Sequence, residues 1–293
     1  MKPQNYTPII IVGAARSGTT ILKKCLSRID GFGAFNNEIN FIWCHGNLEQ
    51  NTDELEPYHA TPNIKRFIRE RFKEFAQENN VQFVIEKTCA NSLRVPFVYE
   101  IFPEAKFIFI VRDGRDAIAS SINCWLNPSN HTDVSSKSQK IPLKKIPFYI
   151  WDSLKQKINN WIFAKKDYQV WGPRFNGIDE IGERFSLEEI CSMQWKLSVE
   201  KAKHAFNEIP DKQVYKLHYE QLATDPENTM VSLLKYLGIK LSATDVREIV
   251  EEVHPHSISK WKKELSPESV EVILPIIQEV LKSENYIRSK TSV

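Results

Sequence analysis

The chain has 293 residues, and its 39 lysine and arginine residues nearly balance its 37 aspartate and glutamate residues, which leaves a formal net charge of +2. A hydrophobic content of 42% excludes a disordered chain, and the charge balance argues against a protein that binds nucleic acid through its phosphates. No apolar run is long enough to span a membrane, and the cysteines are scattered without a CxxC pair. We therefore expect a cytoplasmic protein without a disulfide scaffold or a zinc site.

Short apolar runs alternate with amphipathic segments over the first 125 residues. The runs are rich in β-branched residues and show no polar alternation, which is typical of strands buried on both faces of a parallel sheet. We expect strands over 8–13, 82–87 and 106–111, and helices over 19–29, 63–79, 92–102 and 114–126. This order predicts an α/β fold with a central parallel sheet flanked by helices.

Residues 127–185 interrupt this alternation. They contain several prolines and three tryptophans, and eight lysines against one aspartate fall between Lys137 and Lys166. We interpret the segment as a basic, tryptophan-rich insertion with one helix over about 150–168, within a single domain that spans 1–293. Beyond it we expect a strand over 213–217 and helices over 186–208, 226–237, 242–253 and 266–283, with Gly238 ending the second of these helices.

The segment GAARSGTT (13–20) lies between the first strand and the first helix. Two glycines five residues apart let the backbone curl, so that N–H groups at a helix N-terminus face one anion. A kinase or ATPase loop has a lysine where this chain has Thr19, and the cation here is Arg16. The loop therefore predicts a 5′-phosphate ligand rather than a metal-bound triphosphate.

This loop resembles the 5′-phosphosulfate loop of sulfotransferases that use 3′-phosphoadenosine-5′-phosphosulfate (PAPS). A second segment, FIFIVRDGRDAIASSIN (107–123), resembles the 3′-phosphate motif of the same family, with Arg112 ending a strand and Ser120 eight residues on. A third, VYKLHYEQLATDPENTMVSLLKYLGI (214–239), resembles its late signature, in which we interpret Tyr219 and Glu220 as architectural. The resemblance implies a P-loop NTPase-like sulfotransferase fold with PAPS as co-substrate and no metal.

The resemblance also implies the residues that hold the nucleotide. Arg16, Ser17, Gly18, Thr19 and Thr20 would bind the 5′-phosphosulfate, and Arg112 and Ser120 the 3′-phosphate. The segment HSISKWKKELSPE (256–268) resembles the piece that closes over the nucleotide, so Lys260 and Trp261 are candidates for contacts with the 3′-phosphate and the adenine. We interpret Arg115 and Asp116 as a local ion pair or a helix-start device. WGPRFNGIDE (171–180) resembles a motif of bacterial members, and we assign it no role.

Sulfuryl transfer, which the resemblance implies, requires cations near the leaving phosphate oxygen and a base that takes the proton of the acceptor. Arg16 and Lys87 are the candidate cations, the latter in an EKT segment that resembles the second catalytic element of the family. Cytosolic members place a histidine two residues after that lysine, where this chain has Cys89. Other members have a glutamate about twenty residues after the loop cation, and Glu38 matches that position, in an apolar setting expected to raise its pKa. His45 and His59 are the alternative bases.

The sequence thus predicts metal-independent, in-line transfer of a sulfuryl group from PAPS to a hydroxyl or amine of a small-molecule or saccharide acceptor, and no nucleic-acid partner. The lysines and tryptophans of the insertion favour an anionic, ring-bearing acceptor, although a solvated lysine face over packed tryptophans is the alternative. An ATP-dependent kinase, disfavoured by Thr19, and a nucleotide-binding module without catalysis, suggested by the missing histidine, are the alternative functions.

Overall fold

The computed structural model describes residues 6–127, 171–181 and 184–288. The helix expected over about 150–168, and with it most of the basic insertion, lies outside these ranges. Among the described helices, none combines the length and the apolar composition that crossing a membrane requires.

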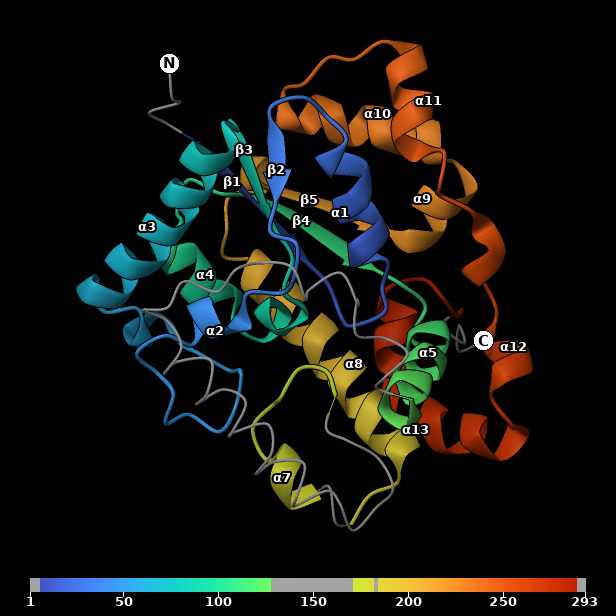
Figure 1. The fold of residues 1–293 in the computed structure, drawn as a ribbon. Helices are drawn as coiled ribbons and strands as arrows, with labels where there is room; N and C mark the ends of the chain where they lie inside the picture. The colour runs from blue at the N-terminus through green and yellow to red at the C-terminus, as the bar shows by residue number, and fades with distance from the viewer. Residues whose placement is uncertain (1–5, 128–170, 182–183, 289–293) are drawn as a thin grey trace.

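The described residues form a parallel sheet of five strands in the order β2-β3-β1-β4-β5 (Figure 1). The strands are β1 (Thr7–Val12), β2 (Phe32–Ala34), β3 (Phe83–Glu86), β4 (Lys106–Val111) and β5 (Val214–His218). The register pairs Ile10 with Glu86, Val12 with Phe109 and Val111 with His218. Because all strands are parallel, their carboxyl ends lie along one edge, so the segments that follow β1, β3, β4 and β5 meet there. The predicted α/β class is confirmed.

Helices cover both faces of the sheet, and alternate strand residues point into two separate cores. One core lies between the sheet and α3 (Pro62–Asn79), α4 (Val95–Ile101), α5 (Gly114–Leu126), α8 (Leu187–Phe206) and α13 (Pro267–Ser283). The other lies between the sheet and α1 (Thr19–Ser27), α9 (Tyr219–Thr224), α10 (Pro226–Leu237) and α11 (Ala243–Val250). This double burial explains the continuous apolar runs of β1 and β4.

Helix ends follow local chemistry. A capping box between Ser186 and Glu189 begins α8, and Gly238, at φ 81°, ends α10 as predicted. The helix expected over 92–102 is shorter, because residues 89–93 form the 3₁₀ helix η2 (Cys89–Leu93) and α4 begins after Arg94. The sequence patterns missed β2, which is three residues long, and the short elements η1 (Pro57–His59), α2 (Asn40–Trp43), α7 (Ile178–Ile181), η6 (Asp211–Gln213), η7 (Pro255–Ser257) and α12 (Trp261–Glu264).

Candidate active site

The glycine loop after β1 is shaped by close backbone approaches. A Cβ on Gly13 would lie 2.6 Å from the carbonyl oxygen of Ile110, and one on Gly18 would lie 2.3 Å from the ring of Tyr219. Gly18 also has φ 88°, in the left-handed region, and is the N-cap of α1 without offering a side chain to its N–H groups. The first turn of α1 therefore keeps backbone donors available for an anion.

Buried donors without partners lie in both predicted phosphate loops. The hydroxyl of Ser17 is fully buried, and Arg112 is 7% exposed. Neither Ser17 Oγ nor Arg112 Nε finds a hydrogen-bond partner within the described part of the chain. Since buried polar atoms are nearly always hydrogen-bonded, these two donors fit an anionic ligand.

The two loops are joined directly to one another. Arg112 donates from Nη1 to the carbonyl oxygen of Arg16 (2.9 Å), and its guanidinium lies 4.7 Å above the ring of Tyr219. Arg16, at φ 66°, donates from Nε to Ser120 Oγ (2.9 Å). Residues that the family resemblance assigns to a 5′-phosphate and to a 3′-phosphate thus lie next to one another.

Glu38 and Lys87 form an ion pair on the other side of the cavity, with 2.7 Å between Lys87 Nζ and Glu38 Oε1. The lysine side chain is 11% exposed and the glutamate side chain 40% exposed, so the apolar enclosure expected around Glu38 is absent. Burial acts to lower the pKa of Lys87, but the negative charges of Cys89, as a thiolate at alkaline pH, and of the Glu38 carboxylate outweigh it and raise that pKa above its ordinary value. Lys87 is therefore a permanent cation.

Cys89 is in contact with the ion pair and with the loop, through hydrogen bonds to Glu38 and Thr19. Burial, followed by the charge of Glu38, raises the pKa of the Cys89 thiol to about 12. The thiol stays protonated near neutral pH, so Cys89 is not a suitable base.

A cavity of about 200 Å³ connects these groups. It is lined by Arg16, Gly18, Thr19, Thr20, Ile21, Glu38, Lys87, Cys89, Arg112, Trp171 and Tyr219. Ser17 lies buried within the loop, and Ser120 is bound to Arg16. The two alternative bases lie elsewhere: the ring of His45 stacks on Phe67 at 3.6 Å, and His59 Nδ1 accepts a hydrogen bond from the backbone of Glu56 (2.9 Å).

Trp171 and Tyr219 also line the cavity. Trp171 belongs to the insertion whose tryptophans were candidates for contact with an acceptor, whereas Tyr219 was expected to be architectural. Tyr219 directly follows β5, so its place at the carboxyl edge of the sheet was a usable signal. Trp171 begins the WGPRF segment, and buried Gln194 holds that segment by donating to the carbonyl oxygens of Trp171 (3.0 Å) and Pro173 (2.9 Å). The segment therefore fixes one wall of the cavity.

The C-terminal segment around Lys260 and Trp261 is attached to the start of α5. Asp116 accepts hydrogen bonds from the backbone N–H groups of Ser259 (2.7 Å) and Trp261 (2.9 Å). The guanidinium of Arg115 lies 4.5 Å from the Trp261 ring and pairs with Asp113, not with Asp116. The expected ion pair between Arg115 and Asp116 is thus wrong, whereas Asp116 does lie in the first turn of α5 and binds the backbone of a distant segment from there.

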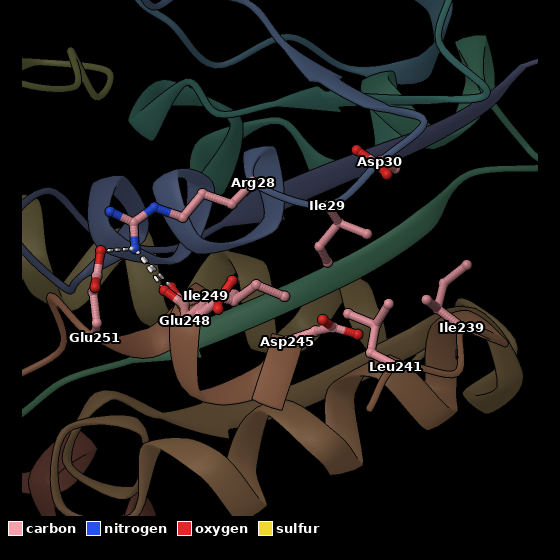
Figure 2. A pocket seen from close by; sticks show the side chains of 9 residues that line it. All are labelled: Arg28, Ile29, Asp30, Ile239, Leu241, Asp245, Glu248, Ile249 and Glu251. Atoms are coloured by element: carbon pink, nitrogen blue, oxygen red, sulfur yellow. Dashed lines mark hydrogen bonds and ion pairs between the residues drawn. The ribbon is translucent and has the colours of Figure 1, made fainter. Parts of the chain in front are cut away.

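A second hollow, of about 550 Å³, lies at the opposite end of α1 (Figure 2). Four carboxylates line it, and its single arginine, Arg28, is bound to the carbonyl oxygen of Glu248 (2.9 Å) and to the carboxylate of Glu251 (3.1 Å). Its negative charge opposes phosphate binding, so the smaller cavity is the candidate active site. Within the described ranges, no group of three or more histidine, cysteine, aspartate or glutamate residues is arranged to hold a metal ion.

Comparison with known proteins gives a family and a fold. The model of the sulfotransferase family matches residues 8–147 and 169–243. One similar solved structure is mouse sulfotransferase SULT7A1 complexed with PAP, with 15% identity, a TM-score of 0.50 and coverage of 96% of this chain and 86% of that chain. Another is the sulfotransferase domain from the curacin biosynthetic pathway, with 11% identity, a TM-score of 0.54 and coverage of 95% of this chain and 98% of that chain. A sulfotransferase from Alicyclobacillus acidocaldarius is also similar, with 15% identity, a TM-score of 0.50 and coverage of 97% of each chain. No curated protein sequence matches the chain.

Proposed function

Because the chain belongs to the sulfotransferase family, we propose that it transfers the sulfuryl group of PAPS to a hydroxyl or amine of an acceptor and releases adenosine 3′,5′-bisphosphate. The observation that carries this proposal is a pair of buried donors, Ser17 Oγ and Arg112 Nε, that lack hydrogen-bond partners within the described chain. Ser17 follows Arg16 in the loop, and Arg112 donates to the carbonyl oxygen of Arg16. The binding of PAP by the mouse relative supports the same nucleotide.

In this proposal the nucleotide lies across the two joined loops. Ser17, Gly18, Thr19 and Thr20 bind the 5′-phosphosulfate through the N-terminus of α1. Arg112 and Ser120 bind the 3′-phosphate, for which the planar guanidinium is suited. Lys260 and Trp261 belong to the segment whose backbone Asp116 binds at the start of α5, shortly after Arg112. From there they contact the nucleotide.

Transfer takes place between the loop and the ion pair. PAPS supplies the sulfuryl group, whose bond to the phosphate oxygen breaks as the acceptor oxygen or nitrogen bonds to sulfur. Glu38 accepts the acceptor proton, which later passes to solvent, and Lys87 and Arg16 stabilise the charge that develops in the transition state. The acceptor enters beside Glu38 and Trp171, and the tryptophan face suits a ring-bearing small molecule or saccharide.

Ligand-dependent thermal unfolding tests the nucleotide class. We expect adenosine 3′,5′-bisphosphate to raise the Tm of the protein and ATP with Mg²⁺ to leave it unchanged, because a ligand that binds only the folded state stabilises it. Transfer of ³⁵S from labelled PAPS into an acceptor panel then tests catalysis. Stabilisation by ATP with Mg²⁺ alone would identify a kinase, and nucleotide binding without transfer to any acceptor would identify a binding module.

A further inference from the structure

The carboxyl group of Glu86 is a buried charge next to the ion pair. Glu86 is the last residue of β3, immediately before Lys87, and its side chain has no exposed surface. Burying a carboxylate is costly unless it is fully hydrogen-bonded. Neither the cavity lining nor the proposed transfer step uses this group.

The chemistry of its neighbours makes both Glu86 oxygens acceptors. Arg94 Nε, which only donates, binds Asn91 Oδ1 (2.8 Å), so the amide nitrogen of Asn91 faces Glu86 Oε2 (2.7 Å). The Ile39 N–H donates to Thr88 Oγ1 (3.1 Å), and the hydroxyl of Thr88 donates in turn to Glu86 Oε1. A directed chain of hydrogen bonds therefore runs from the buried carboxylate to the residue after Glu38.

The same network also holds Asn40, the second residue after Glu38. Asn40 donates from Nδ2 to Asp53 Oδ1 (2.8 Å) and accepts a hydrogen bond from Arg94 on its own Oδ1. Asp53 also accepts from the backbone N–H of Arg174 (2.8 Å), in the segment that carries Trp171. The chain beyond Glu38 is thus held at two consecutive residues, through the backbone of Ile39 and the side chain of Asn40, and both are tied to the network around Glu86.

We infer that Glu86 and Thr88 are positioning residues that hold Glu38 against Lys87, an assignment that rests on the proposed role of Glu38 as the base. Glu86 touches neither substrate nor the reacting atoms. It orients the Thr88 hydroxyl, which fixes the Ile39 amide and with it the direction of the Glu38 side chain.

The charge of Glu86 gives this arrangement a pH dependence. Burial raises the pKa of Glu86 to about 7, against the opposing hydrogen bond from Thr88. The charged groups around it are Glu38, which raises the pKa further, Arg94, which lowers it, and Lys87, the next residue along the chain. Above pH 7 both oxygens accept and the chain is complete. Below pH 7 a proton on Oε1 removes the acceptor of the Thr88 hydroxyl and releases it.

The amide resonance of Ile39 tests the positioning without requiring turnover. In a ¹⁵N-labelled protein, assigned with Ile39→Val, we expect this resonance to titrate with a midpoint near pH 7 and to stop titrating in Glu86→Gln. Thr88→Val should move the resonance to the position of an amide without a hydrogen bond, and Thr88→Ser should keep it in place. An Ile39 resonance that ignores both Glu86→Gln and Thr88→Val overturns the inference, even if PAPS is not the substrate.

Kinetics provide the second measurement. We expect Thr88→Val to lower kcat about tenfold, the equivalent of one buried hydrogen bond, with the affinity for adenosine 3′,5′-bisphosphate unchanged. Thr88→Ser, which keeps the hydroxyl, should restore kcat, and Glu86→Gln should abolish the fall in kcat below pH 7. Equal losses in Thr88→Val and Thr88→Ser, or a loss of nucleotide affinity in step with kcat, would overturn the inference. Calorimetric binding of the nucleotide tests the proposed function separately.

Discussion

The phosphate side of the cavity is built from backbone and buried donors, whereas the transfer side is built from charged side chains that bind one another. Ser17 Oγ and Arg112 Nε have no partners in the described chain, while Lys87 Nζ lies 2.7 Å from Glu38 Oε1. The first arrangement gains hydrogen bonds when an anion binds, and the second is complete without one. Variants on the phosphate side should therefore change affinity, and variants on the transfer side should change turnover.

The largest expected effect is on the transfer side. Glu38→Gln removes the proposed base without changing its size, and we expect kcat to fall about a thousandfold while nucleotide affinity is unchanged. Steady-state rates of ³⁵S transfer and calorimetric nucleotide binding measure the two quantities. Glu100→Gln is the matched control, because Glu100 also pairs with a lysine, Lys65, but lies outside the cavity. A kcat close to that of the control would remove Glu38 as the base.

A smaller effect of the opposite kind is expected on the phosphate side. Arg112→Ala removes the charge-assisted hydrogen bond that the unpartnered Nε offers to the 3′-phosphate, so the Kd for adenosine 3′,5′-bisphosphate should rise about fiftyfold, with kcat nearly unchanged at saturating PAPS. Arg28→Ala, in the acidic hollow at the other end of α1, should leave the Kd unchanged. An Arg112→Ala variant that loses kcat but keeps its Kd would contradict the division between the two sides.

The positions of the phosphate-side residues could be predicted from the sequence because local patterns encode them. Apolar runs mark the strands, the parallel order brings their carboxyl ends together, and so Arg16 and Arg112 meet at one cavity. The two glycines of the loop are a visible signal for the same reason, because Gly13 and Gly18 lie too close to Ile110 and Tyr219 for a larger residue to fit without displacement.

The transfer side was less predictable because it depends on contacts between distant segments. Glu38 was identified by its distance from Arg16 along the chain, but its exposure and its ion pair depend on a loop that Thr88 and Arg94 hold from another part of the fold. Asp116 likewise binds the backbone of Ser259, and a contact between residues so far apart in the sequence cannot be predicted from local periodicity. Three residues of β2 carry too little pattern to be recognised, and only the pairing with β3 forms that strand.

The smallest effect separates backbone conformation from contact at the phosphate loop. Gly18 and Gly238 have nearly the same φ, 88° and 81°, but a Cβ on Gly18 would lie 2.3 Å from the Tyr219 ring, whereas a Cβ on Gly238 meets no atom within 4 Å. Gly238→Ala should therefore lower the free energy of unfolding by about 1 kcal/mol through the left-handed conformation alone, and leave the nucleotide Kd unchanged. Gly18→Ala carries the same conformational cost and also displaces Tyr219, so it should be less stable and raise the Kd about tenfold. Urea unfolding and calorimetry measure both, and a Gly18→Ala variant that matches Gly238→Ala in both would show that the contact with Tyr219 does not shape the phosphate side.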